Sequence, residues 1–275
     1  MQPIIGNLRK LKSEFQSPVD YYLRIGDLEI PLNTWLGQFI SFRYTHTIHC
    51  IQCQRKTNKS FQQGFCYSCL RKLMECDLCM IFPERCHVQQ GTCPTDDWAH
   101  AHCHQAHIVY LANASGLKVG ITRETQIPTR WIDQGAKQAL PIFKVANRYQ
   151  AGCIEVVLKQ FVSDRTNWRA MLGREVVKKD LKAERDVLLK QAESPLNDVF
   201  SAFAKKDIVY LEDNIITELD YPILQYPKKI QSLSLDKTPE VQGKLQGIKG
   251  QYLLLDTGVI NIRKFGGYEV ECQLC

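Results

Sequence analysis

Cysteine pairs in the first third of the chain are the residues whose spacing indicates chemistry most directly. Cys50 and Cys53 form a Cys-x2-Cys pair, and after twelve intervening residues Cys66 and Cys69 form another. Each such turn presents two thiolates to one tetrahedral Zn²⁺ ion, and the loop between the pairs brings the second pair back to close the site. A site of four thiolates has no open position for water, so we expect a structural zinc ion.

A second group of cysteines follows and offers more ligands than one ion needs. We predict that a second structural zinc ion binds four of them, Cys76, Cys79, Cys86 and Cys93. His87 and Cys103 are alternative ligands of that ion. Nine of the twelve cysteines lie between residues 50 and 103, in a segment with almost no aliphatic core. The folding of this segment is therefore predicted to depend on metal.

The chain shows no segment that would carry these cysteines to an oxidising compartment. Residues 1–12 contain no apolar stretch typical of a signal peptide, and no apolar run approaches the roughly 18 residues of a membrane helix. In a reducing compartment, paired thiols bind metal more often than they form disulfides. We therefore expect a cytoplasmic protein that binds zinc and does not engage a membrane.

Positive charge is concentrated in one window of the sequence. The whole chain has 35 basic and 29 acidic residues, a net charge of +6, and residues 111–170 alone have nine basic and four acidic ones. Such a local excess attracts polyanions, of which nucleic acid is the commonest, although a solvated surface with an uneven charge is the alternative. The residues predicted to contact nucleic acid are Lys118, Arg123, Arg130, Lys137, Lys144 and Arg148.

The pattern of elements divides the chain into four parts. With 44% hydrophobic residues the chain is typical of a folded protein, and we expect an α+β multidomain fold. The expected parts are a small β unit, a Cys/His-rich zinc module, an α/β domain, and a charged helix followed by a β-rich segment. They cover residues 1–49, 50–107, 108–173 and 174–275.

The third part has the clearest succession of elements. Strands are predicted over residues 108–111 and 117–122, and a short helix starts near Pro128 and ends near Gly135. A third strand over residues 139–145 and a helix over residues 149–162 complete it. In the fourth part, a charged helix over residues 174–192 is expected to end before Pro195.

Four residues fall on these elements in an order that resembles a known module. Ile108-Val109-Tyr110, then Lys118-Val119-Gly120, then Arg130 and finally Glu155 resemble the motifs of GIY-YIG endonucleases. The resemblance implies a small α/β domain that cuts phosphodiester bonds, with Tyr110, Lys118, Arg130 and Glu155 at the catalytic positions and a divalent ion on the glutamate. The whole chain also resembles an uncharacterised bacterial family of Cys-rich, zinc-binding proteins, a domain of unknown function.

A phosphodiester needs a cation at a bridging oxygen, a donor for the developing charge and a group that orients water. Glu155, Arg130 and Tyr110 can supply these three functions. Lys118, however, stands where the family has its second tyrosine, and an ammonium is a poor proton acceptor at neutral pH. Burial beside Arg130 could lower its pKa and restore a role as a base.

Each of these residues also has a purely structural interpretation. Glu155 precedes Lys159 by four residues, as in an ordinary surface pair on a helix, and Tyr110 lies in an apolar strand that could form a core. Arg130 could stack on Trp131.

The favoured function is binding of DNA or RNA by a zinc-stabilised protein with weak or no nuclease activity. The first alternative is an active endonuclease with Mg²⁺ or Mn²⁺ at Glu155. The second is a zinc scaffold for protein partners.

Overall fold

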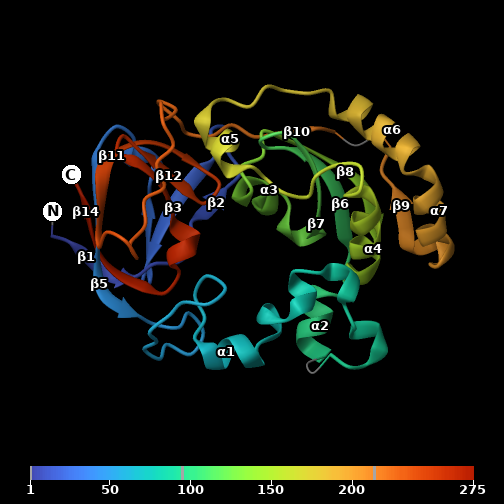
Figure 1. Ribbon diagram of the computed structural model, residues 1–275, viewed down its shortest axis with the longest axis horizontal. Helices are drawn as coiled ribbons and strands as arrows, with labels where there is room; N and C mark the ends of the chain where they lie inside the picture. Colours follow the sequence, from blue (N-terminus) through green and yellow to red (C-terminus); the bar gives the residue numbers. More distant parts are fainter. Residues whose placement is uncertain (1, 94–95, 213–214) are drawn as a thin grey trace.

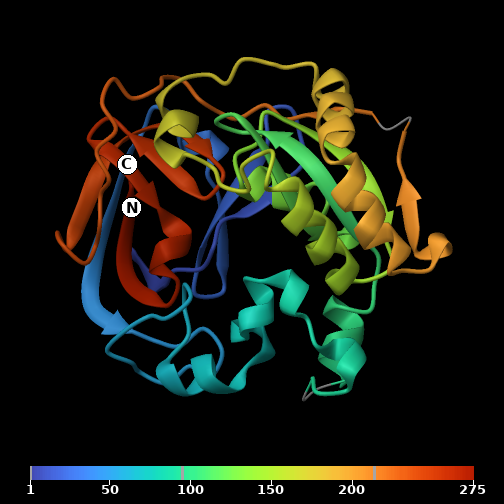
Figure 2. The same ribbon diagram turned by 45° about the vertical axis from the view of Figure 1, so that its right-hand side comes forward.

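The computed structural model describes residues 2–93, 96–212 and 215–275, and the chain has the expected α+β fold. Two units built on antiparallel sheets lie side by side, and a Cys-rich segment connects them along one edge (Figures 1 and 2). We call these the β unit (residues 2–49 and 219–275), the cysteine module (residues 50–106) and the α/β unit (residues 107–218).

The β unit contains two antiparallel sheets. The larger sheet has six strands in the order β1 (Ile4–Asn7), β14 (Tyr268–Leu274), β5 (Phe39–Ile48), β11 (Glu240–Lys249), β12 (Tyr252–Leu255) and β13 (Gly258–Asn261). The smaller sheet has three, β2 (Lys12–Glu14), β3 (Asp20–Ile25) and β4 (Leu28–Pro31).

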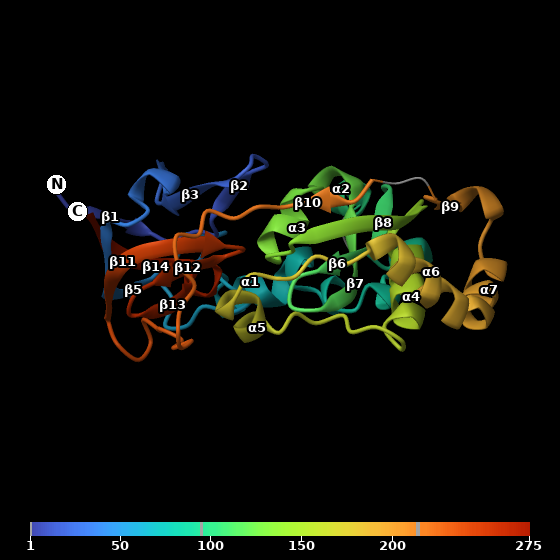
Figure 3. The same ribbon diagram turned by 90° about the horizontal axis from the view of Figure 1, so that it is seen from above.

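The two ends of the chain belong to one sheet rather than to two separate parts. β5 pairs with β11 through Phe42 and Val241, and with β14 through Phe42 and Cys272. The two termini consequently lie close together in Figures 1 and 3. The predicted division between residues 1–49 and 174–275 is therefore corrected, because the buried faces of these strands form a common core that local patterns do not reveal.

The cysteine module is made of short turns around its thiols. It contains α1 (Tyr67–Lys72) and α2 (Asp96–His102), with four short 3-10 turns between them. They include η3 (Leu78–Met80) and η4 (Pro83–Arg85). Apart from the thiols, its buried residues are few, as expected for a segment that a metal organises.

The α/β unit is a five-stranded antiparallel sheet covered by helices. The strand order is β10 (Thr217–Glu218), β8 (Gln138–Val145), β6 (His107–Asn113) and β7 (Leu117–Arg123), and β9 (Ile208–Tyr210) also pairs with β8. Its helices are α3 (Thr129–Asp133), α4 (Arg148–Leu158), α5 (Trp168–Gly173), α6 (Leu181–Gln191) and α7 (Glu193–Ser201).

The central strand β6 is apolar along its whole length because both of its faces are covered. Ile108, Tyr110 and Ala112 contribute to the core shared with the β unit, whereas Val109 and Leu111 pack against the helices on the other face. This alternation follows from the two-residue period of a strand. It fixes which side of the sheet receives the Tyr110 side chain.

The predicted succession of strands and helices over residues 108–162 is confirmed, with shifts of one to four residues at the ends. The charged helix ends at Gln191, before Pro195 as expected, but it starts at Leu181 and not at residue 174. Pro195 lies in the first turn of the next helix, α7, where a proline without an N–H is tolerated. Among the residues that the structure describes, no helix has the length and apolar character needed to cross a membrane.

Candidate functional site

A cavity of about 810 Å³ opens where the three units meet, and all three contribute to its walls. Eight basic and four acidic side chains line it, so its charge is positive. The basic ones are Lys10, Lys118, Arg123, Arg130, Arg148, Lys159, Arg165 and Arg263. Six of these eight come from the positively charged window of the sequence.

The pairing of β6 with β7 positions two of the predicted catalytic residues. Tyr110 lies opposite Gly120, and Ala112 lies opposite Lys118, so the side chains of Tyr110 and Lys118 project from the same face. The phenol lies across Gly120, where an added Cβ would be 2.7 Å from the Tyr110 oxygen. Glycine at this position is therefore a steric requirement of the tyrosine.

Tyr110 is completely buried and its hydroxyl is fixed by a hydrogen bond. The hydroxyl donates to Oε1 of Gln134 at 2.9 Å, and the Arg130 side chain of α3 also interacts with it. Burial raises the pKa of Tyr110, and the positive charge of Arg130 partly opposes that rise. The phenol is consequently a neutral hydrogen-bond donor at physiological pH.

Lys118 is a buried cation with one weak partner among the described residues. Its Nζ donates to Oγ1 of Thr166 at 3.3 Å, and no carboxylate of the described chain lies within ion-pair distance. Burial, followed by repulsion from Arg130, lowers the pKa of Lys118 to about 8, although Glu155 and Asp164 favour the charged form. The ammonium is thus available to an anion.

Glu155 reaches the same cavity from α4. This helix begins at Asn147, whose side chain accepts a hydrogen bond from the backbone N–H of Gln150 at 3.0 Å. Burial raises the pKa of Glu155 to about 6, and the nearby charges of Lys159, Asp164 and Arg130 modify it. No ion pair joins Glu155 to Lys159 within the described chain, so the carboxylate is not held in a surface pair.

Three of the four predicted catalytic residues, Lys118, Arg130 and Glu155, therefore line one cavity. Tyr110 does not line it, because the ring is completely buried, and only its contacts with Gln134 and Arg130 connect it to the lining.

Arg123 and Arg148 also line the cavity, but their guanidinium groups are engaged elsewhere. Arg123 donates to the carbonyl of Ala101 at 3.3 Å, and Arg148 donates to the carbonyls of Cys79 and Met80.

Two of the residues predicted to contact nucleic acid do not line this cavity. Lys137 pairs with Asp220 at 2.6 Å and with Glu175 at 3.4 Å, and it is largely buried. Lys144 pairs with Glu124 at 2.8 Å. Both lie on or beside β8, which is separated from β7 by β6. Counting charge along the sequence cannot distinguish lysines that face the cavity from lysines that neutralise carboxylates.

No local pattern in the sequence predicts the cavity residues that the β unit contributes. Arg263 lies in the 3-10 turn η8 (Ile262–Phe265), and Lys10 lies just before β2. Lys10 pairs with Asp133 at 3.2 Å, and Gln251 donates to the same carboxylate at 2.8 Å. These contacts anchor the end of α3, and therefore Arg130, against the β unit.

The first four cysteines form a cluster with the dimensions of a zinc site. The sulfur atoms of Cys50, Cys53, Cys66 and Cys69 all lie within 4.8 Å of one another. A tetrahedral Zn²⁺ with Zn–S bonds of about 2.3 Å requires sulfur atoms about 3.8 Å apart, and the Cys53 and Cys66 sulfurs are 3.8 Å apart. Although burial opposes ionisation, backbone N–H donors lower the pKa of Cys50 to about 6, which favours the thiolate ligand.

The second group of cysteines is less compact than the first. Cys79, Cys86 and Cys103 pack together, and contacts with the Cys103 and Cys79 thiols lower the pKa of Cys86. Cys93 interacts electrostatically with Cys103. Cys76 is also buried, and its thiol lies near enough to Cys50 to feel its charge. Cys103, predicted as an alternative ligand, is therefore in contact with two of the four predicted ligands.

Asp77 lies between Cys76 and Cys79 and caps η3. Its side chain accepts a hydrogen bond from the Cys79 N–H at 2.8 Å. The imidazole of His87 lies with the carboxylate of Asp77 and the sulfur of Cys79, within 4.8 Å of one another. His87 is thus beside the second group, as an alternative ligand should be.

The cysteine module is attached to both neighbouring units. Helix α4 packs so closely on η4 that a Cβ at Gly152 would overlap the backbone of Pro83 and Glu84. On the other side, Arg9 donates to the carbonyl of Ile51 at 2.9 Å and Ser60 donates to the carbonyl of Gly266 at 3.0 Å. The module therefore connects the β unit and the α/β unit along one edge (Figure 2).

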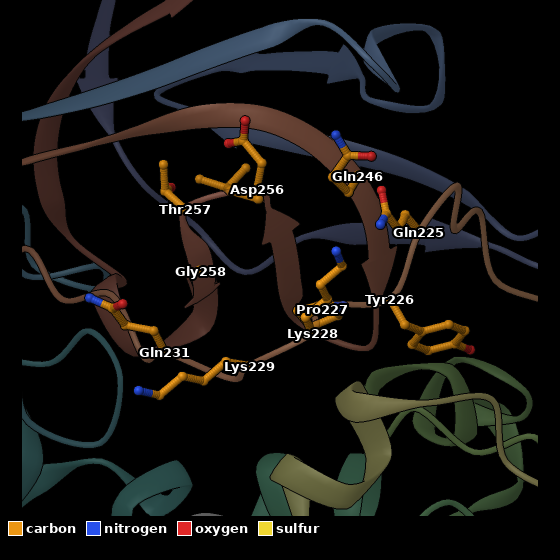
Figure 4. Close-up of a pocket in the computed structure, with 11 residues that line it drawn as sticks. Gln225, Tyr226, Pro227, Lys228, Lys229, Gln231, Gln246, Asp256, Thr257 and Gly258 are labelled. Carbon is orange, nitrogen blue, oxygen red and sulfur yellow. The ribbon is translucent and has the colours of Figure 1, made fainter.

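A smaller cavity of about 340 Å³ lies in the β unit beside β12 and β13 (Figure 4). Lys228, Lys229 and Asp256 are its charged residues, and the Asp256 carboxylate already accepts the backbone N–H of Lys244 at 2.9 Å. None of the residues predicted to act in catalysis or metal binding lines it. The larger cavity is therefore the candidate site.

No curated protein and no solved structure matches this chain. A family model does match, over residues 37–270, more than four-fifths of the chain. The matched range contains the cysteine module, Tyr110 and the cavity residues Lys118, Arg130, Glu155 and Arg263. The chain accordingly belongs to the family described as "Protein of unknown function (DUF2797)".

Proposed function

We propose that the protein is a cytoplasmic, zinc-stabilised nucleic-acid-binding protein whose α/β unit is a GIY-YIG-like module with weak or no nuclease activity. The observation that carries the proposal is the convergence of Lys118, Arg130 and Glu155 on one positively charged cavity, with the buried Tyr110 in contact with Arg130 and Gln134 of its lining. Phosphate groups are the anions that a guanidinium and an ammonium bind together most readily.

The four side chains suggest a division of roles toward a phosphodiester. Arg130 and Lys118 bind the phosphate oxygens, and the neutral Tyr110 hydroxyl holds Gln134 in place beside them. Glu155, with its pKa of about 6, is a carboxylate at neutral pH. A bound Mg²⁺ or Mn²⁺ would supply Lewis acidity at that carboxylate, and an active endonuclease would need it.

Lys118 is the reason for proposing binding without efficient cleavage. With a pKa of about 8, it is mostly protonated at neutral pH and therefore binds an anion better than it accepts a proton from water. The active endonuclease is the second candidate, because a lysine with a lowered pKa has a larger neutral fraction than an ordinary one.

Cleavage assays on the wild type and on Glu155→Ala decide between these two candidates. Single-stranded, duplex and branched substrates are incubated with Mg²⁺ or Mn²⁺, and strand scission is measured together with binding in a chelator-free buffer without Mg²⁺ or Mn²⁺. We expect both proteins to bind and neither to cut appreciably. Robust metal-dependent turnover that Glu155→Ala abolishes would establish the endonuclease, whereas no binding at low salt would leave a zinc scaffold for protein partners.

The cysteine clusters support two structural zinc ions in the proposal. Cys50, Cys53, Cys66 and Cys69 hold the first ion, and Cys79, Cys86, Cys93 and Cys103 hold the second. Zinc analysis of Cys103→Ser and Cys76→Ser tests the revised ligand set. We expect Cys103→Ser to lose one of two zinc ions and Cys76→Ser to keep both; the reverse result would restore the ligand set expected from spacing.

A further inference from the structure

The guanidinium of Arg263 is the feature of the cavity that the proposed function leaves unused. In the described part of the chain it makes no hydrogen bond and no ion pair, although it lies near Arg130 and Asp133. Burial, together with repulsion from Arg130, lowers the pKa of Arg263. Two guanidinium groups with so few partners are unfavourable neighbours unless an anion lies between them.

The packing of the residues around Arg263 in η8 places its side chain at the cavity. Ile262 and Phe265, which flank it in η8, are completely buried, and Asn261 caps the turn by accepting the Lys264 N–H at 3.3 Å. The side chain of the adjacent Lys264 is exposed and pairs with Asp236 at 3.4 Å. Arg263 and Lys264 are consecutive, but their side chains lie on different surfaces, and only Arg263 lines the cavity.

The size of the cavity limits what can lie between its walls. Arg263 comes from the β unit, and Arg130 and Lys118 come from the α/β unit, so a ligand that contacts all three must enter between the two units. A volume of about 810 Å³ falls within the range of roughly 300–1,000 Å³ that encloses small ligands. This space suits one or two nucleotides of a strand rather than a base-paired helix.

The cysteine module forms the remaining wall of the cavity, and this wall carries exposed apolar side chains. Phe82 is 38% exposed and Ile81 is 60% exposed, and both line the cavity with Met80. The Arg85 guanidinium lies 4.9 Å from the centre of the Phe82 ring and covers part of it. Exposed aromatic rings beside basic residues are stacking surfaces for unpaired bases, which a duplex keeps inside its own stack.

We propose that the cavity holds an unpaired nucleic-acid strand, with Arg263 binding its phosphates opposite Arg130 and Phe82 stacking on a base. This inference rests on the proposed function and adds the class of substrate. It also gives the β unit a direct role in binding. The strand is recognised by its phosphates and its exposed bases, so both DNA and RNA are tested.

The experiment compares affinities of the full-length zinc-loaded protein for three fluorescent probes of equal charge, measured by anisotropy in EDTA-free buffer at low salt without Mg²⁺ or Mn²⁺. The probes are a single-stranded DNA, the same sequence as RNA, and a DNA hairpin with a paired stem. We expect at least one single-stranded probe to bind about tenfold more tightly than the hairpin. Equal affinity for the strands and the hairpin would overturn the inference.

Matched variants test the two named residues. Arg263→Gln should reduce single-strand affinity and lower the slope of log affinity against log salt by about 0.7, the value of one phosphate contact on a single strand. Arg263→Lys should retain most of the affinity, and Lys264→Gln should behave like the wild type. Phe82→Ala should weaken single-strand binding between about fivefold and one-hundredfold, whereas Phe15→Ala, at a residue of similar exposure (50%) outside the cavity, should not.

The outcomes separate this inference from the proposed function. Circular dichroism first shows that Arg263→Gln and Phe82→Ala are folded. If these two variants bind like the wild type while Arg130→Ala binds more weakly, the protein binds nucleic acid but not in the inferred way. If the wild type binds no probe at low salt, both proposals fail.

Discussion

At the scale of single residues, the cavity is defined by ionisable groups whose surroundings place their pKa values near neutrality. The pKa of Glu155 is raised to about 6, chiefly by burial, and the pKa of Lys118 is lowered to about 8 for the same reason. Between these values Glu155 is a carboxylate and Lys118 is an ammonium. A change of pH therefore alters the charge of the cavity in two separate steps.

Nucleic-acid affinity, measured without Mg²⁺ or Mn²⁺ in chelator-free buffer, should accordingly fall as the pH rises from 5 to 9. Above about pH 6, ionised Glu155 repels phosphate, and above about pH 8, Lys118 loses the proton that attracts it. A bound phosphate stabilises the ammonium, so the upper step will lie somewhat above pH 8 in the complex. Lys118→Met should remove the upper step and reduce affinity at pH 7 roughly tenfold. Lys144→Met changes a lysine that is paired with Glu124 outside the cavity, and this variant should retain the upper step.

The packing of Tyr110 on Gly120 gives a second prediction at this scale. Gly120→Ala should lower the free energy of unfolding by about 1–3 kcal/mol, because the new Cβ would lie 2.7 Å from the phenol oxygen and force the ring to move. Gly173→Ala is the matched control, since its Cβ would be 3.3 Å from the flexible end of Ile230 and should change the free energy by less than about 1 kcal/mol. Urea denaturation measures both; equal stability of Gly120→Ala and wild type would contradict the packing.

At the scale of elements, the strands and helices around the cavity could be predicted, but the second group of cysteines could not. The apolar runs of β6 and β8 and the periodicity of α4 are local, so the sequence predicts them directly. Which thiols meet depends instead on how the 3-10 turns after Cys76 fold back onto α4. The end of the charged helix before Pro195 could likewise be predicted, whereas the second helix that starts at Glu193 could not, because a proline is compatible both with a helix end and with a first helical turn.

The cysteine module gives a prediction about how metal supports these elements. Cys66→Ser should lose one zinc ion and much of its soluble yield, because Cys66 is a buried member of the first cluster. Cys275→Ser, which changes an exposed thiol at the end of the chain, should do neither. Elemental analysis of protein purified without added zinc measures the ion content. A wild-type protein with one zinc ion or none would contradict the two-site proposal.

At the scale of the whole molecule, the site exists only because distant parts of the chain meet. Asp133 at the end of α3 contacts Lys10 and Gln251 of the β unit, and the cysteine module contacts both neighbours. The charge window predicted a basic surface near residue 130, yet Arg263 lies more than 130 residues further along the chain. Its position follows from the pairing of β5 with β11 and β14, which no local pattern encodes.

The salt dependence of nucleic-acid binding tests the central claim most directly. The affinity of the wild type, Arg130→Ala and Lys144→Ala for a single-stranded oligonucleotide is measured in chelator-free buffer without Mg²⁺ or Mn²⁺, between about 50 and 200 mM salt. We predict that log affinity for the wild type falls with log salt with a slope of about −1.4 to −2.1, as two to three phosphate contacts require. Arg130→Ala should bind more weakly with a shallower slope, and Lys144→Ala should match the wild type. An affinity that does not change with salt, or an Arg130→Ala protein that binds like the wild type, would contradict a phosphate-binding role for this cavity.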